Sequence, residues 1–496
     1  VIKMVEAMRR GVVPKTLHVD APSPHVDWSA GSVELVTEAR PWPESDRPRR
    51  AAVSSFGMSG TNAHVVLEGV AEEPAATAAG TTAPETSQPV AVVVSARDEG
   101  ALRALAAGVV PVVEERGVAA VAAGLASRAV FEHRAVVVSG VEGLRALAEG
   151  REAPGVVRGV AAGVVRAVMV FPGQGSQWAG MGARLLDECP VFAEQVAACA
   201  AALAPYVDFD VVQVLRSGRL PERADVVQPV LWAVMVALAG VWRSFGVEPA
   251  GVIGHSQGEI AAAVVAGALS LEDGAAVVAL RSRALRALSG SGAMASIAAP
   301  VEEVERLAAG YAGVEVAVVN GPAATVVSGP VAAVEALVAA CETQGVRARR
   351  IAVDYASHCA LVEPIADQVR AIGVEPRSAD VPFYSTVTGE RIDTAGLDGG
   401  YWYANLRGRV RFADAVAAAR ADGHGVFIEV SPHPVLTMNI DDAVAIGTLH
   451  RDEGGMDRFL LSAGEAFVAG VPVTWPKVDA VPAQLPTYPF QHQRYW

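Results

Sequence analysis

Apolar runs alternate with helix-like patterns through most of the chain and predict an α/β protein. The main run of this kind begins with a buried strand at Arg166–Phe171 and continues to about residue 445. Strands and helices that alternate in this way are typical of a doubly wound fold with a parallel sheet. We therefore expect one large α/β domain over residues 166–449.

Residues 292–353 interrupt this alternation and predict an inserted subdomain. Their order is strand, helix, two strands, helix and strand, as in ferredoxin-like folds. The expected strands are Ala293–Ile297, Val314–Val319, Thr325–Ser328 and Arg347–Val353, and the expected helices are Val301–Ala309 and Val331–Gln344.

The flanking segments differ from the main domain in pattern. Residues 1–69 end in a turn followed by an apparent buried strand at Asn62–Glu68, and residues 70–89 have the Ala, Thr, Pro and Glu content of a linker. Residues 90–165 predict a small α/β unit with strands at Val90–Ser95 and Arg134–Ser139 and no convergent catalytic side chains. The Pro-rich residues 450–496 predict an extended tail lying on another surface.

Charge and composition exclude several classes of function. The 496 residues carry a formal net charge of −14, which argues against nucleic acid as a partner. We expect that no apolar run reaches the length of a membrane span, and we expect no membrane partner and no signal peptide. The four cysteines show neither metal-ligand nor disulfide spacing, so we expect no metal and a reducing, cytoplasmic location. Val1 already reads as mid-helix, which predicts a piece of a longer chain.

The sequence Gly254-His255-Ser256-Gln257-Gly258 carries the clearest chemical signal. An apolar strand precedes it and a helix pattern of small residues follows from Glu259. Strand, Gly-x-Ser-x-Gly turn and helix form a nucleophile elbow, which exposes the serine at a helix N-terminus. A chance match in a glycine-rich chain is the alternative, and the flanking pattern disfavours it.

A serine nucleophile requires a base. His358 ends the apolar run Val353–His358, expected to be a strand that leads into a polar turn, and is the preferred candidate. His255 is too close to Ser256 along the chain to reach its hydroxyl, and the prolines around His433 favour a rigid loop. A structural role for His358 stays open at this level.

Two further groups suit acyl transfer. The backbone N–H of Gln257 and a group of Gln174, on a glycine-rich turn after the first strand, are candidates for an oxyanion hole. Arg281 lies in the helix pattern Glu272–Leu288 among Ala, Val and Leu. A buried arginine needs an anion, and a substrate carboxylate would serve, although a surface position for Arg281 is the alternative.

These motifs together resemble the acyltransferase domain of a modular type I polyketide synthase. The resemblance is carried by Phe171–Gln177, Gly254–Glu259, Arg281 and Tyr355–His358. It extends over the whole chain: residues 1–69 are similar to the tail of a ketosynthase domain, and 70–165 and 450–496 to the linkers before and after an acyltransferase. The ketosynthase's catalytic residues would precede Val1, so no condensing activity is expected.

The resemblance implies a role for each matching residue. Ser256 would be the acylated nucleophile, His358 its base, Gln174 and Gln257 the oxyanion hole, and Arg281 the ligand of an extender unit's carboxylate. Asn405 would support His358 through its main-chain carbonyl, and Gln228 would line the pocket. Tyr355 and Ser357 belong to a Tyr-Ala-Ser-His sequence that accompanies methylmalonyl selection in the family.

The resemblance also implies substrates and partners. Methylmalonyl-CoA would supply the acyl group, and the phosphopantetheine of an acyl carrier protein would receive it. No cofactor would be bound by this chain, and the rest of the synthase module, including its ketosynthase, would be a partner. A serine esterase or thioesterase of the α/β-hydrolase class is the main alternative, and a non-catalytic docking scaffold is the second.

Overall fold

The computed structural model describes residues 1–70, 89–221 and 223–493. The chain divides into two compact units, Val1–Thr82 and Ala83–Trp496. Nearly all of the linker expected at residues 70–89 lies outside the described residues, as does the end of the tail at 494–496.

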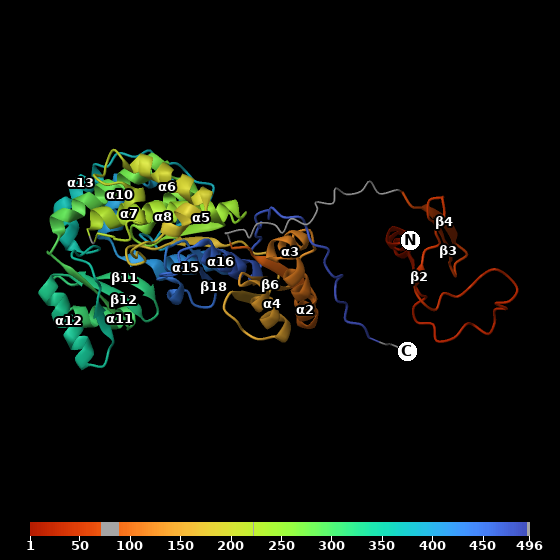
Figure 1. The fold of residues 1–496 in the computed structure, drawn as a ribbon. Coiled ribbons are helices and arrows are strands. Elements are labelled where there is room, and N and C mark those ends of the chain that lie inside the picture. The colour runs from red at the N-terminus through yellow and green to blue at the C-terminus, as the bar shows by residue number, and fades with distance from the viewer. Residues whose placement is uncertain (71–88, 222, 494–496) are drawn as a thin grey trace. The chain divides into compact units, whose positions relative to one another are not determined.

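The first unit contains one helix and two small antiparallel pairs of strands (Figure 1). Its elements are α1 (Ile2–Arg10), β1 (Val12–Val13), β2 (Arg40–Pro41), β3 (Arg50–Phe56) and β4 (Asn62–Glu68), with β1 pairing β2 and β3 pairing β4. Asn62–Glu68 is therefore a strand, as expected. The expectation that it is buried is wrong, because β3 alone among the described strands pairs with it and most of its side chains are exposed.

The second unit begins with a three-stranded antiparallel sheet covered by helices. Its elements are β5 (Val92–Ala96), α2 (Glu99–Arg116), α3 (Val118–Leu125), β6 (His133–Val137), α4 (Gly140–Glu149) and β7 (Val156–Val160). The apolar side chains of β5 and α2 form a core of their own. The sequence predicted β5 and β6 but not β7, whose Arg158 and Gly159 interrupt the apolar run.

A six-stranded sheet forms the centre of the main domain. The strand order is β15-β14-β9-β8-β17-β18, and every neighbouring pair is parallel except β14 and β15. The strands are β8 (Val168–Phe171), β9 (Gly251–Gly254), β14 (Phe383–Tyr384), β15 (Arg391–Ile392), β17 (Val426–Glu429) and β18 (Val444–Gly447). The expected parallel α/β sheet is confirmed. Residues of β8 and β9 are fully buried because helices cover both sheet faces.

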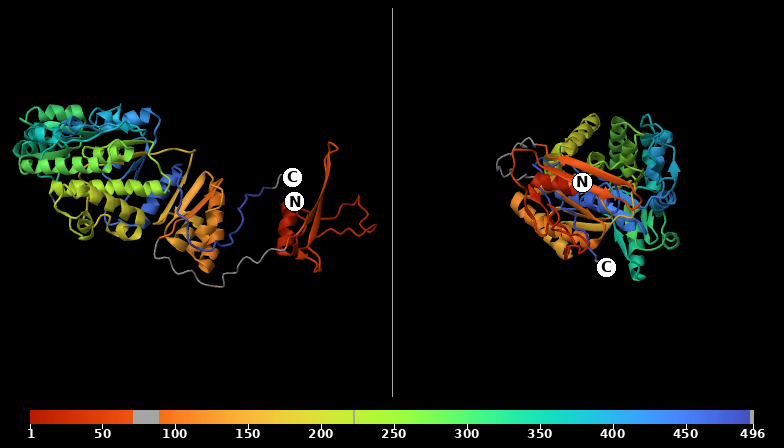
Figure 2. Two further views of the ribbon diagram at one scale, coloured as in Figure 1. Left: turned by 90° about the horizontal axis from the view of Figure 1, so that it is seen from above. Right: turned by 90° about the vertical axis from the view of Figure 1, so that its right-hand side faces the viewer.

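Helices α6, α8 and α10 pack side by side as a layer on this domain (Figures 1 and 2). The helices of the main domain are α5 (Ala183–Glu188), α6 (Pro190–Leu203), α7 (Val211–Arg216), α8 (Ala224–Ser244), α9 (Gly258–Ala266), α10 (Leu271–Leu285), α13 (Ala366–Arg370), α14 (Gly399–Arg407) and α15 (Phe412–Ala421). Short 3₁₀ turns lie at Arg286–Leu288, Ala360–Ile365, Thr394–Gly396 and Thr437–Asn439.

Helix α8 is long and apolar enough to cross a membrane by length and composition, which corrects the expectation that no run reaches that length. Of its most apolar stretch, 94% is buried inside the protein. Core packing against α6 and α10 therefore accounts for its composition.

The expected ferredoxin-like insertion is present. Strands β10 (Ala293–Ile297), β11 (Glu315–Gly321), β12 (Ala324–Gly329) and β13 (Ala348–Arg350) alternate with α11 (Val301–Ala308) and α12 (Val331–Thr343). The sheet order is β13-β10-β12-β11 with a fifth strand, β16 (Val410–Arg411), parallel to β11. This fifth strand comes from a distant part of the chain, and no local pattern predicted it.

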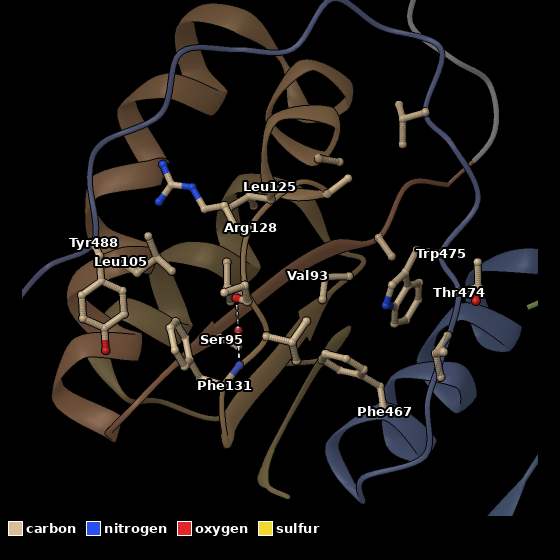
Figure 3. A pocket seen from close by; sticks show the side chains of 18 of the residues that line it. Val93, Ser95, Leu105, Leu125, Arg128, Phe131, Phe467, Thr474, Trp475 and Tyr488 are labelled. Carbon is tan, nitrogen blue, oxygen red and sulfur yellow. Dashed lines mark hydrogen bonds between the residues drawn. The ribbon is translucent and has the colours of Figure 1, made fainter. Parts of the chain in front are cut away.

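The C-terminal segment returns to the three-stranded sheet. The expectation of an extended tail over residues 450–496 is wrong for its first part, because Met456–Val468 form helix α16, whose apolar side chains pack against β6 and β7. The described residues after this helix run without helix or strand along the same unit. The N–H of Ala483 donates to the Ala120 carbonyl at 2.9 Å, and the N–H of Arg97 to the Tyr488 hydroxyl at 2.9 Å. Figure 3 shows the aromatic side chains that line the roughly 820 Å³ groove between these segments.

Candidate active site

The turn around Ser256 is a tight elbow between β9 and α9. Ser256 has a φ of 54°, a left-handed conformation that is rare for a serine and typical of nucleophile elbows. A Cβ on Gly258 would lie 2.1 Å from the Phe171 carbonyl oxygen, and one on Gly254 would lie 2.2 Å from the Glu259 nitrogen. Gly258 is therefore required for the turn to pass so close to β8, and Gly254 for the end of β9 to lie against the first turn of α9.

The Ser256 hydroxyl lies 2.8 Å from Nε2 of His358. The other ring nitrogen, Nδ1, lies 2.8 Å from the Gly408 carbonyl oxygen. Since a carbonyl only accepts, Nδ1 carries the proton, and the lone pair of Nε2 faces the serine. Burial, with the nearby positive charge of Arg281, lowers the pKa of His358 to about 3. The imidazole is therefore neutral and placed to accept the serine proton.

The structure corrects two expectations about His358. Val353–His358 is not a strand: β13 ends at Arg350, and His358 has a φ of 62° in an irregular segment. The carbonyl that supports the imidazole belongs to Gly408 and not to Asn405. Helix α14 ends at Arg407, so the extended Gly408 turns its carbonyl out of the helix toward His358, whereas the Asn405 carbonyl stays in the last turn.

The side chain of Asn405 is nevertheless part of the site. Its Nδ2 donates to the Ser256 carbonyl oxygen at 3.0 Å and to Oε2 of Glu259 at 2.9 Å. Its Oδ1 accepts a hydrogen bond from Arg281 at 3.3 Å. Asn405 thus connects the elbow to Arg281.

The other two histidines considered for the base face away from the serine hydroxyl. Nε2 of His255 lies 2.9 Å from Oδ1 of Asn320, and burial lowers the pKa of His255 to about 4. Nδ1 of His433 accepts from the backbone N–H of Arg451 at 3.2 Å. Neither ring is hydrogen-bonded to the Ser256 hydroxyl in the described part of the chain.

The two candidate oxyanion-hole residues both line the cavity at Ser256. Among the described residues, the backbone N–H groups of Gln174 and Gln257 donate to no other group. Both N–H groups are therefore available to a ligand oxygen. The Gln174 side chain is used elsewhere, since its Oε1 accepts from the Tyr355 hydroxyl at 3.0 Å.

Arg281 is 1% exposed, which excludes the surface position considered for it. It donates to Oε1 of Gln228 at 3.1 Å and to Oδ1 of Asn405, while its Nε has no partner in the described residues. No carboxylate of the described chain lies within ion-pair distance of it. Burial lowers its pKa to about 10, so it stays charged and able to bind an anion.

Tyr355, Ser357 and Gln228 lie on the same cavity, whose volume is about 200 Å³. Nε2 of Gln228 donates to the Tyr355 hydroxyl at 2.9 Å, and the Ser357 hydroxyl faces Sδ of Met294 at 3.7 Å. The structure thus gathers eight predicted residues around one cavity, with Asn405 directly behind it.

Sequence reasoning missed Gly408 and Glu259. Glu259 is fully buried in the first turn of α9, and it accepts hydrogen bonds from Thr386, Tyr401 and Asn405. A lone carboxylate in an otherwise apolar helix was the available signal. In the described part of the chain, no group of three or more His, Cys, Asp or Glu side chains has a metal-binding arrangement.

Comparison with known proteins agrees with this geometry. The family model described as acyl transferase domain matches residues 168–473, and the one described as ketoacyl-synthetase C-terminal extension matches residues 22–138. The chain belongs to the acyl transferase domain family. It is an acyltransferase domain of polyketide synthase type, which sets aside the esterase and scaffold alternatives.

Several relatives are similar over the whole chain. Spectinabilin polyketide synthase system protein NorA' of Streptomyces orinoci is 54% identical over all of this chain and 14% of its own length. Mycoketide-CoA synthase of Mycobacterium tuberculosis is 52% identical over all of this chain and 12% of its own length. The chain therefore spans about one seventh or less of these two relatives.

Solved acyltransferase domains have the same fold. The acyltransferase domain from module 8 of the salinomycin polyketide synthase is 53% identical, with a TM-score of 0.75 over 78% of this chain and 97% of that chain. A loading acyltransferase from the avermectin modular polyketide synthase is 49% identical, with a TM-score of 0.58 over 60% of this chain and 98% of that chain.

Proposed function

We propose that this domain transfers a carboxylated acyl group from CoA, through an ester on Ser256, to the phosphopantetheine thiol of an acyl carrier protein. The observation that carries the proposal is a neutral His358 at 2.8 Å from Ser256 with the unpaired cation Arg281 on the same cavity. A serine and base suit acyl transfer, and a buried cation suits an acyl chain that ends in a carboxylate.

In the first half-reaction, His358 takes the proton of Ser256 as the serine oxygen attacks the thioester carbonyl. The free N–H groups of Gln174 and Gln257 receive the negative charge that forms on the carbonyl oxygen. The intermediate collapses, the C–S bond breaks, and His358 gives its proton to the leaving CoA sulfur. The product is an acyl ester of Ser256.

In the second half-reaction, the carrier-protein thiol loses its proton to His358 and attacks the acyl ester. The same two N–H groups stabilise the second oxyanion. This intermediate collapses, the bond between the acyl carbon and the Ser256 oxygen breaks, and His358 returns the proton to that oxygen. The enzyme is then free. Arg281 holds the acyl carboxylate throughout, which keeps the ester oriented toward the thiol and away from water.

We further propose methylmalonyl as the acyl group. Ser357 is small and lies beside the cavity, whereas a phenylalanine there would occupy the space that an α-methyl group needs. Gln228 and Gln174 hold the Tyr355 hydroxyl, which fixes the ring along this wall. One methyl group in such a pocket discriminates by only about 1–3 kcal/mol, so the preference over malonyl is expected to be modest.

The test combines acceptor and extender choice in one assay. The domain is given equal methylmalonyl-CoA and malonyl-CoA, with a carrier protein or with water alone, and products are read by mass. We expect methylmalonyl on the carrier protein, slow release to water, and a shift toward malonyl in the Tyr355→His, Ser357→Phe variant. Faster transfer to water than to the thiol would contradict acyl transfer, and preferred malonyl loading would contradict the methylmalonyl assignment.

A further inference from the structure

A buried carboxylate lies behind the cavity and takes no part in the steps above. Glu259 is 0% exposed, and both its oxygens are occupied by donors from two other segments. Oε1 accepts from the N–H and hydroxyl of Thr386 at 2.5 and 3.0 Å. Oε2 accepts from the Tyr401 hydroxyl at 2.8 Å and from Asn405 at 2.9 Å.

Glu259 determines which way the Asn405 amide points. An amide has two donor hydrogens at one end and an acceptor oxygen at the other. Both hydrogens of Nδ2 face acceptors, Oε2 of Glu259 and the Ser256 carbonyl oxygen, so Oδ1 must face Arg281. A flipped amide would turn its hydrogens toward the guanidinium, and the contact with Arg281 would become repulsive.

We propose that Glu259 is a positioning residue for Arg281, acting through the Asn405 amide. Its carboxyl group lies one side chain away from the guanidinium, because Asn405 is hydrogen-bonded to Oε2 of Glu259 and to Arg281. Because the two make no direct ion pair, the guanidinium stays available to the acyl carboxylate. This inference rests on the proposed function, since it gives Arg281 a carboxylated ligand.

The test replaces Glu259 by Gln. The new NH₂ group must face either the Thr386 N–H or the NH₂ of Asn405, so a donor opposes a donor on one side. The readout is the ratio of kcat/KM for methylmalonyl-CoA to that for propionyl-CoA, with Arg281→Ala as the reference. We expect Glu259→Gln to lower this ratio about tenfold, as for loss of a hydrogen bond to a charged group. Propionyl transfer should change much less.

Three outcomes would overturn the proposal. A parent-like ratio in Glu259→Gln, with a reduced ratio in Arg281→Ala, would contradict this inference and leave the proposed function standing. Equal rates for both substrates in the parent domain would contradict both. Equal losses for both substrates in Glu259→Gln would make the role of Glu259 merely structural.

Glu429→Gln is the matched control. Glu429 is 1% exposed and accepts from the N–H groups of Val435, Leu436 and Thr437, and in the described residues it has no hydrogen bond to Asn405 or Arg281. Val435 and Leu436 line the cavity, so any loss of activity in Glu429→Gln should fall on both substrates alike. Its variant should keep the parent ratio, and an equal drop there would overturn the proposal.

Asn405→Ala covers the case in which Glu259→Gln does not fold. It should show the same selective loss. Where Glu259→Gln does fold, adding it to Asn405→Ala should lower the ratio little further, because coupled residues are not additive. Losses of the ratio that multiply in the double variant, or a parent-like ratio in Asn405→Ala, would contradict the link.

Discussion

At the scale of single residues, burial sets the chemistry of His358. Removal from water penalises the imidazolium, and the Arg281 charge adds to that effect, so the pKa falls to about 3. The contact between Nδ1 and the Gly408 carbonyl fixes the tautomer. The site therefore holds a base that is ready over the whole neutral range.

The depressed pKa of His358 also predicts a pH dependence of stability. An unfolded histidine has a pKa of about 6.5. Between this pH and the folded-state pKa of about 3, the unfolded chain binds a proton at His358 and the folded chain does not. The free energy of unfolding therefore falls as the pH falls through this range. Between pH 7 and pH 5, the free energy of unfolding should fall by about 2 kcal/mol more in the parent than in His358→Asn, which lacks this histidine.

Urea unfolding at the two pH values measures this difference. Burial raises the pKa of Glu259 to about 7, which acts in the opposite direction, but Glu259 is present in both proteins and cancels. Equal losses in the parent and the variant would contradict the buried, neutral state of His358.

The sequence predicted Ser256, His358 and Arg281 because each carries a local signal: a Gly-x-Ser-x-Gly turn, a histidine after an apolar run, and a charge in an apolar helix. It misplaced the support of His358 because that contact depends on where α14 ends, and Gly408 has no side chain to mark it. Glu259 carries a weaker signal, a lone carboxylate in an apolar helix, and its partners Thr386, Tyr401 and Asn405 lie more than a hundred residues away along the chain.

At the scale of elements, the elbow between β9 and α9 passes so close to β8 that it restricts which residues can stand in the turn. The N–H of His255 donates to the Phe171 carbonyl oxygen at 2.8 Å, and a Cβ on Gly258 would collide with that same oxygen. Backbone atoms cannot move aside cheaply, so this contact accounts for the glycine.

Gly258→Ala should therefore destabilise the domain by about 3 kcal/mol, at the upper end of the cost of overpacking a core. Gly373→Ala is the control, because its Cβ would meet nothing within 4 Å. Urea unfolding of the two variants measures the difference, and we expect a lower midpoint for Gly258→Ala than for Gly373→Ala. A Gly258→Ala midpoint as high as that of Gly373→Ala would contradict the geometry of the elbow.

Elements with strong apolar periodicity were predicted well, and those made by distant pairing were not. The ferredoxin-like order followed from local runs of four to fourteen residues. Strand β16 has only two residues, Val410 and Arg411, and exists because it pairs with β11 across a long loop. Such pairing leaves no local signal.

At the scale of the whole second unit, the cavity is lined by residues of the main domain and of the inserted ferredoxin-like subdomain. Ser256 follows the six-stranded sheet, Arg281 comes from the helical layer, and Met294 comes from the inserted subdomain. The α/β class and the insertion were predictable from the order of elements. The shape of the cavity was not, because it depends on how these separate elements pack.

The acylation of Ser256 is tested most directly by the mass of the intact domain after incubation with methylmalonyl-CoA, followed by peptide mapping. With Ser256 as the nucleophile, we expect one methylmalonyl group per chain, on Ser256, and none on a folded Ser256→Ala variant. An acyl group on another residue, or an equal mass gain in Ser256→Ala, would contradict it.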